Sequence, residues 1–175
     1  ELDRRGADYR MVETGQHAAL LPGLRQQLGL REPAVRLSGS EDVDGIGRAI
    51  WWMIGLARLL VSRRALSERV FGGAGGVCLV HGDTPSTLMA VLMARRTGLS
   101  VAHLESGLRS RSFLDPFPEE LIRTIVMRLA DVVFAPDVVA EENLAAMSVR
   151  ARVVRTSGNT GREMLADAVV DVEAA

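Results

Sequence analysis

The chain has 175 residues, of which 47% are hydrophobic and 25% charged, a composition typical of one folded domain rather than a disordered segment. Its 21 basic and 22 acidic side chains leave a formal charge of −1, which argues against a nucleic-acid partner. Every basic residue is an arginine, so chemistry that needs a lysine amine is excluded within this sequence. The single cysteine, Cys78, excludes an internal disulfide and a cysteine zinc site.

The sequence contains no pattern expected of a membrane protein. The longest uncharged apolar run, Ala49 to Ala57, is shorter than the roughly 20 residues needed to cross a bilayer. No signal peptide precedes it, so we expect a cytoplasmic protein without a membrane partner. The chain begins at Glu1 without a methionine, within what reads as the tail of a helix, and we expect it to be a fragment.

Short β-rich runs alternate with segments of helical periodicity along the chain. This alternation predicts an α/β fold with a Rossmann-like parallel sheet, forming a single domain over residues 1–175. The predicted strands are 8–13, 34–37, 76–81, 100–104, 131–135 and 152–156. The predicted helices are 16–29, 44–70, 85–97, 118–130, 138–147 and 160–169.

The longest predicted helix, 44–70, carries apolar residues at near-helical spacing that we expect to pack on a sheet. These residues are Ile46, Ile50, Met53, Ile54, Ala57, Leu60 and Val61, and Trp51 and Trp52 widen the stripe. The glycines at 72, 73, 75 and 76 precede a strand, whereas a dinucleotide-binding turn follows one, so we interpret them as a loop.

Polar motifs follow the first, third and fourth predicted strands, and together they contain all three histidines of the chain. Open parallel sheets bind ligands at the carboxyl ends of their strands, which makes these motifs candidate site residues. They are Thr14-Gly15-Gln16-His17, His81-Gly82-Asp83-Thr84 and His103-Leu104-Glu105-Ser106-Gly107-Leu108-Arg109.

Each of these motifs also has a structural interpretation. Thr84 can cap the following helix, with a proline in its first turn, but capping does not require Asp83, which can accept sugar hydroxyls or act as a base. Glu119 and Glu120 suit the start of a helix, and the two prolines nearby would hold a catalytic carboxylate rigidly. Gly158 and Asn159 form a turn that capping explains as well as phosphate binding does.

A metal site is a further alternative. His81 with Asp83, and His103 with Glu105, form two pairs at spacing i, i+2 on strands that could be neighbours. All four residues lie at strand ends, where this spacing does not ensure that two side chains share a face. The pattern alone therefore gives little support to a metal.

Several motifs in order along the chain resemble the non-hydrolysing UDP-N-acetylglucosamine 2-epimerase family. The resemblance runs from about residue 8 to residue 169. It is carried by the three strand-end motifs above and by Pro116-Phe117-Pro118-Glu119-Glu120 with Arg123, Phe134-Ala135-Pro136 and Gly158-Asn159-Thr160. Ser106 departs from the family pattern, in which alanine is commoner.

The resemblance implies a glycosyltransferase-B-like fold of two Rossmann-like halves, with UDP-sugar in the cleft between them. This chain would be the N-terminal half without its first strand, and the C-terminal UDP-binding domain would be absent. The implied reaction is epimerisation of UDP-N-acetylglucosamine to UDP-N-acetylmannosamine by anti elimination and re-addition of UDP, with no cofactor and no metal. We expect a homodimer as the full-length enzyme and no activity from residues 1–175 alone.

Site residues follow from the same resemblance. The catalytic carboxylates carry over to Asp83, Glu105 and Glu119, without an assignment of acid and base. The substrate-binding residues carry over to Gln16, His17, Thr84, His103, Arg109 and Asn159. In bacterial members the Gln-His motif is tied to a second, regulatory UDP-sugar site.

Two other functions remain open. A UDP-sugar glycosyltransferase of the same fold would share the domain but not the three carboxylates. A non-catalytic sugar-nucleotide-binding or scaffold fragment would explain the missing ends.

Overall fold

A computed structural model describes residues 2–3, 5–16, 18–39, 42–43, 45–73, 75–110, 117–156 and 158. Residue contacts divide the chain into two compact units, Glu1–Gly75 and Gly76–Ala175. This division does not test the expectation of a single domain over residues 1–175, which stays a prediction. The predicted helix 160–169 lies outside the described residues.

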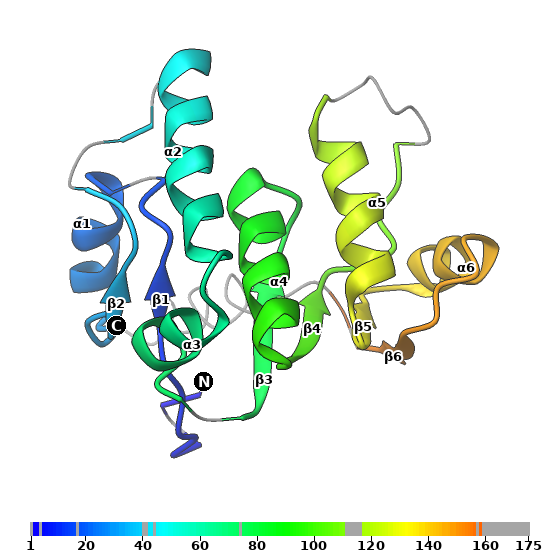
Figure 1. Ribbon diagram of the computed structural model, residues 1–175. Coiled ribbons are helices and arrows are strands. Elements are labelled where there is room, and N and C mark those ends of the chain that lie inside the picture. The colour runs from blue at the N-terminus through cyan, green and yellow to red at the C-terminus, as the bar shows by residue number, and fades with distance from the viewer. Residues whose placement is uncertain are drawn as a thin grey trace. The chain divides into compact units, whose positions relative to one another are not determined.

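The first unit holds two short parallel strands and most of its residues in helices and loops (Figure 1). Strand β1 (Val12–Glu13) pairs with β2 (Val35–Arg36), and each is shorter than the sequence predicts. The helices are α1 (Leu20–Gln27), α2 (Ile46–Leu59) and α3 (Arg63–Ala65), and α3 continues into a π-helical turn, η1 (Leu66–Val70). The glycine-rich segment after η1 is a loop in its described residues, as predicted.

The predicted helix 44–70 is broken, and its buried face differs from the predicted stripe. The break falls after Leu59, because Ser62 adopts an extended backbone and its side chain accepts a hydrogen bond from the Ala65 N–H, starting a new helix. Within α2, Trp52 and Leu56 are buried, whereas Ile50 and Ile54 are exposed. The sequence pattern therefore assigned the apolar stripe about half a turn away from the face that packs.

The second unit is a four-stranded parallel sheet in the order β3-β4-β5-β6. Its strands are β3 (Val77–His81), β4 (Ser100–Leu104), β5 (Val132–Ala135) and β6 (Arg152–Arg155). They alternate with α4 (Pro85–Thr97), α5 (Glu119–Leu129) and α6 (Val138–Ala146). These elements confirm the predicted ones to within one or two residues.

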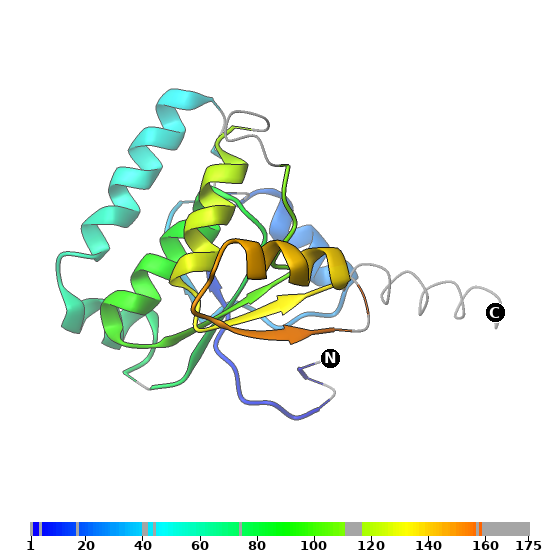
Figure 2. The ribbon, with the colours of Figure 1, turned by 90° about the vertical axis from the view of Figure 1, so that its right-hand side faces the viewer.

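The three helices of this unit lie on the same face of the sheet (Figures 1 and 2). That arrangement follows from right-handed crossovers between strands that run in sequential order. The interface between them is the core, and its side chains include Val91, Val101, Val126, Val133 and Leu144, each fully buried. No helix in the described part of the chain is long and apolar enough to cross a membrane.

Asp131 joins the amino ends of the central strands. Its Oδ2 accepts a hydrogen bond of 2.8 Å from the Val101 N–H of β4, and Arg95 of α4 contacts both of its oxygens at 2.8 and 3.0 Å. The hydrogen bond from the Val101 N–H, together with the Arg95 charge, lowers the pKa of Asp131 below its usual value.

This lowered pKa makes the stability contribution of Asp131 depend on pH. The contribution is complete above the ordinary carboxyl pKa of 3.8 and is lost as the pH falls through the lower folded-state value. We expect Asp131→Asn to reduce the free energy of unfolding at pH 7 by about 1 kcal/mol or less, since the pair is partly exposed. Denaturant titrations should show this difference shrinking below pH 4, and a difference that grows instead would contradict the assignment.

Candidate functional site

Asp83, Thr84 and Glu105, three predicted site residues of the second unit, lie where β3 and β4 end side by side. The two strands pair along their whole length, with His81 of β3 opposite Leu104 of β4. The loops that follow therefore begin next to each other at one edge of the sheet, the edge where parallel α/β proteins bind ligands. Asp83 lies in the first loop and Glu105 in the second.

Thr84 caps the helix after β3. Its side-chain oxygen accepts a hydrogen bond of 3.3 Å from the Thr87 N–H, and Pro85 occupies the first helical position. The Thr87 hydroxyl donates to the His81 carbonyl at 2.9 Å, which ties the end of β3 to the first turn of α4. Thr84 thus has the capping role that its structural interpretation predicts, and its role in substrate binding stays a prediction.

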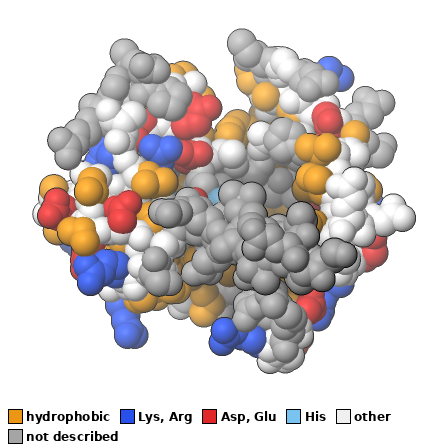
Figure 3. All heavy atoms as spheres, turned by 180° about the vertical axis from the view of Figure 1, so that it is seen from behind, with side chains coloured by type: hydrophobic (Ala, Val, Ile, Leu, Met, Phe, Trp, Pro, Cys, Tyr) orange, Lys and Arg blue, Asp and Glu red, His pale blue; other side chains and the backbone are white. Residues whose placement is uncertain are grey.

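Four charged side chains form a continuous network between the loops and α5. Arg123 of α5 donates from Nη2 to Oδ2 of Asp83 and, at 2.9 Å, from Nη1 to Oε2 of Glu120. Arg109, in the loop after β4, donates from Nε to Oε1 of the same Glu120. In Figure 3, acidic and basic side chains lie next to one another on the molecular surface. The network links both strand-end loops to one helix.

Glu120 is the buried centre of this network, with a side chain that is 0% exposed. Burial opposes its ionisation, but the hydrogen bonds from Arg109 and the Ser110 N–H and the charges of Arg109 and Arg123 outweigh that effect. As a result, the pKa of Glu120 lies below its usual value, and the side chain is a carboxylate at neutral pH.

Glu105 contacts a different partner, the imidazole of His81, whose Nε2 lies 3.0 Å from its Oε2. The two partners differ in exposure, because the side chain of His81 is 55% exposed and that of Glu105 only 16%. Glu105 has a φ of 53°, in the left-handed region that non-glycine residues rarely adopt. Such local strain is commonest where the surrounding structure holds a functional side chain in place.

The turn that carries Glu105 is held by three contacts with β5 and α6. The Ser106 N–H donates to the Phe134 carbonyl of β5 at 2.8 Å, and the Asn143 side chain of α6 donates to the Gly107 carbonyl at 2.9 Å. A Cβ atom at Gly107 would lie 2.2 Å from the Ala140 carbonyl oxygen, so the turn packs directly on the backbone of α6. These contacts hold Glu105 at a set position above the sheet.

His103 is buried beneath the two loops rather than exposed at the edge. It is 1% exposed; its Nε2 lies 2.9 Å from the Gly82 carbonyl and its Nδ1 2.6 Å from the Ser106 hydroxyl. Burial lowers the pKa of His103. Both ring nitrogens thus join the loop after β3 to the loop after β4, and the predicted contact of His103 with substrate stays a prediction.

Glu119, the third predicted catalytic carboxylate, begins α5 next to Glu120. It is half-buried, and its Oε2 is buried with no hydrogen-bond partner among the described residues. A buried carboxylate oxygen without a donor is costly, which favours a site that a ligand donor completes. The cis peptide Phe117–Pro118 directly precedes it.

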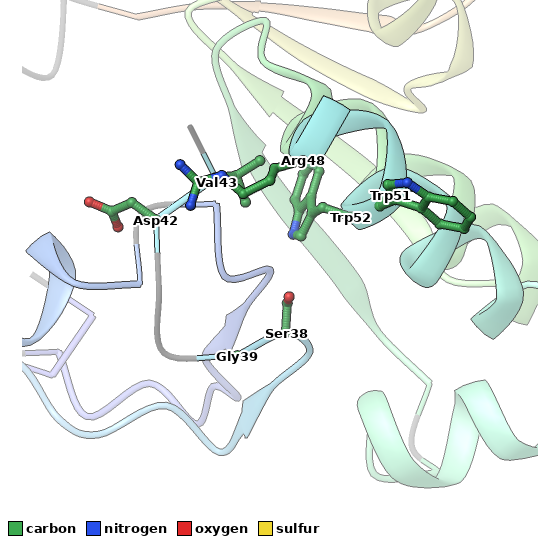
Figure 4. A pocket seen from close by; sticks show the side chains of 7 residues that line it. All are labelled: Ser38, Gly39, Asp42, Val43, Arg48, Trp51 and Trp52. Carbon is green, nitrogen blue, oxygen red and sulfur yellow. The ribbon is translucent and has the colours of Figure 1, made fainter. Parts of the chain in front are cut away.

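The first unit contains a pocket of about 450 Å³ that the sequence did not predict (Figure 4). The Trp52 indole points from α2 toward Ser38, and its Nε1 donates to the Thr14 carbonyl at 3.0 Å. The pocket is lined by Ser38, Gly39, Asp42, Val43, Arg48, Trp51 and Trp52.

Gln16 does not line that pocket but adjoins it in sequence and structure, because its carbonyl accepts a hydrogen bond from the Val43 N–H at 3.1 Å. Its predicted role in substrate binding stays a prediction. His17 and Asn159, two further predicted substrate-binding residues, lie outside the described residues. In the part of the chain that the structure describes, no group of three or more His, Cys, Asp or Glu side chains is arranged to hold a metal.

Comparison with known proteins decides the family. The family model described as UDP-N-acetylglucosamine 2-epimerase matches residues 1–175. The chain belongs to this family. This match confirms the resemblance to UDP-N-acetylglucosamine 2-epimerases that the motifs carry, whereas membership of the non-hydrolysing branch stays a prediction.

Individual relatives agree with this assignment. The chain is 39% identical over 95 residues to the UDP-N-acetylglucosamine 2-epimerase of Bacillus subtilis, covering 54% of this chain and 25% of the relative. It is 27% identical over 158 residues to the Campylobacter jejuni enzyme, covering 90% of this chain and 39% of the relative. The chain thus spans about a quarter to two-fifths of the length of these relatives.

Solved structures show the same family and confirm the predicted fold class. A putative epimerase from Listeria monocytogenes superposes with a TM-score of 0.70 at 26% identity, covering 87% of this chain and 38% of that one. The Neisseria meningitidis enzyme bound to UDP-GlcNAc gives 0.68 at 25% identity, covering 86% and 39%. These epimerases have a glycosyltransferase-B-like fold, of which this chain matches a part.

Within this epimerase-family chain, sequence reasoning proposed Asp83, Glu105 and Glu119 as catalytic residues, which stays a prediction, and gave no role to the contacts of Glu120. We interpreted Glu120 as a complement to the helix dipole, whereas it is the buried partner of two arginines. A signal was available, because Glu120 and Arg123 stand at the i, i+3 spacing of a helical ion pair. The Asn143 contact with Gly107 gave no comparable signal, since 36 residues separate the partners.

The close packing of Gly107 on α6 predicts a sharp stability effect. Gly107→Ala combines strain at a φ of +90° with a Cβ 2.2 Å from a backbone oxygen, and we expect it to lower the free energy of unfolding by about 2–4 kcal/mol. Gly82→Ala is the matched control, because Gly82 has a similar φ of +79° but no atom within 4 Å of its Cβ position. Denaturant unfolding that shows equal losses for both variants would contradict the packing argument.

Proposed function

We propose that the complete protein carrying this chain interconverts UDP-N-acetylglucosamine and UDP-N-acetylmannosamine without hydrolysis. The family assignment supports an epimerase. It also favours this function over the glycosyltransferase and scaffold alternatives. The observation that carries the proposal is the convergence of Asp83 and Glu105 on one sheet edge, with Arg123 linking Asp83 to the first turn of α5, where Glu119 lies.

In the proposed reaction, the sugar first loses a proton and its bond to UDP, and then regains both. A carboxylate removes the proton from the sugar carbon that bears the N-acetyl group, the bond to UDP breaks, and a double bond forms in the sugar ring. A proton then returns to the opposite face of the same carbon while UDP adds back. Because the proton leaves one face of the sugar ring and returns to the other, acid and base groups are needed on both faces. Carboxylates from separate segments of the chain supply them in this proposal.

Stabilisation of the leaving UDP needs positive charge or hydrogen-bond donors at the diphosphate. At this sheet edge, Arg109 and Arg123 are both paired with carboxylates, so their charges are already neutralised. We therefore assign this chain the acid–base chemistry and the rest of the complete protein most of the diphosphate recognition. The homodimer, the cytoplasmic location and the inactivity of residues 1–175 alone stay predictions.

The proposed reaction has a direct test. The complete protein is incubated in D₂O with UDP-N-acetylglucosamine and no acceptor, and the sugar signals are followed by NMR. We expect the manno isomer to appear, with deuterium at the carbon bearing the N-acetyl group. Release of free sugar and UDP would instead indicate a hydrolysing enzyme or a transferase, and an unchanged substrate would refute the proposal.

The three carboxylates can be tested individually in the same assay. We expect Asp83→Asn, Glu105→Gln and Glu119→Gln each to lower kcat by about a hundredfold or more, because each removes an acid or base group. Glu141→Gln is the matched control, since Glu141 of α6 makes only a loose, partly exposed pair with Arg155 at 3.6 Å. Any of the three variants that keeps the wild-type kcat has no part in the mechanism.

A further inference from the structure

Glu120 is a buried carboxylate whose contacts reach Asp83 through a single arginine. Its Oε1 accepts from Arg109, and its Oε2 accepts from Arg123 at 2.9 Å and from the Ser110 N–H at 3.2 Å. We propose that Glu120 is a positioning residue, which sets the orientation of Asp83 for proton transfer by fixing the guanidinium of Arg123. The proposal rests on the epimerase function proposed above.

The geometry of Arg123 explains why it can orient a carboxylate. The guanidinium is a rigid planar fork, so fixing one terminal nitrogen also fixes the direction of the other. Glu120 holds Nη1, and Nη2 contacts Oδ2 of Asp83. Within the described residues Arg123 contacts Asp83 through Oδ2, and the proposal assigns Oδ1 to the substrate.

The burial of each partner shows which end of the network is fixed. Glu120 is 0% exposed, whereas Arg123 is 17% and Asp83 23% exposed. Exposure thus rises along the chain of contacts from the protein interior to the sheet edge. Glu120 also starts from the same helical turn as Arg123, at spacing i, i+3, so the helix backbone itself sets their separation.

Proton transfer is sensitive to this kind of placement, because a shift of about 1 Å in a reacting group can cost about a hundredfold in rate. We therefore expect Glu120→Gln to lower kcat by about tenfold to a hundredfold while KM changes less than about threefold. Glutamine keeps the size of the side chain but loses the charge that holds Arg123. Activity is measured by NMR on the complete protein, at temperatures where thermal unfolding shows each variant to be folded.

A second pair of variants tests the proposal independently, in case Glu120→Gln does not fold. Arg123→Lys keeps the positive charge but loses the fork, and we expect a fall in kcat of at least about tenfold. Arg95→Lys is the matched control, because Arg95 contacts both oxygens of Asp131 at the opposite ends of the strands. We expect Arg95→Lys to leave kcat unchanged.

Combining Glu120→Gln with Asp83→Asn separates positioning from a general structural role. If Glu120 acts through Asp83, its loss has little further effect once the Asp83 carboxylate is gone, and the double variant should match Asp83→Asn within about threefold. A purely structural defect would instead multiply the two losses. A multiplied loss, or a wild-type kcat for Glu120→Gln, would overturn the proposal.

Failure of the proposed function has a different signature. If the unaltered protein does not epimerise UDP-N-acetylglucosamine, the epimerase proposal falls and the positioning role falls with it. If the unaltered protein is active and Glu120→Gln is equally active, the positioning role alone is wrong.

Discussion

The site is organised around one electrostatic constraint, the burial of the Glu120 carboxylate. An ionised carboxylate inside a protein is very costly unless cations and hydrogen-bond donors replace its water. Here Arg109, Arg123 and the Ser110 N–H supply them. Those partners come from the loop after β4 and from α5, so neutralising one charge holds two separate segments together, and Arg123 extends the link to the loop after β3.

A second set of contacts, between uncharged groups, also holds the loops after β3 and β4 in place. The buried imidazole of His103 contacts the Gly82 carbonyl on one side and the Ser106 hydroxyl on the other. Gly107 packs on the backbone of α6 with no room for a Cβ atom. The sheet, α5 and α6 thus each contribute contacts that hold the turns at Gly82–Thr84 and Glu105–Gly107.

The sequence predicts the second unit well because each of its elements has a local signal. Short apolar runs mark the strands, and Thr84 with Pro85 marks the start of α4. The sequence predicts the first unit less well, because periodicity did not reveal the break at Ser62 or the face buried by Trp52. Asp83 and Glu105 stood out by their places after strands and Glu119 by the prolines before its helix, whereas the proposed role of Glu120 depends on its contacts with Arg109 and, through Arg123, with Asp83, which lie in other segments.

The three candidate carboxylates differ in the groups that face them, and this difference suits the proposed reaction, which needs both an acid and a base. Asp83 faces a guanidinium, which keeps its charge at every physiological pH. Glu105 faces the imidazole of His81, with Nε2 and Oε2 3.0 Å apart. Glu119 has a buried Oε2 with no donor in the described structure. Unlike surroundings let chemically identical groups take opposite roles in proton transfer, and the partners at this sheet edge give the three carboxylates unlike surroundings.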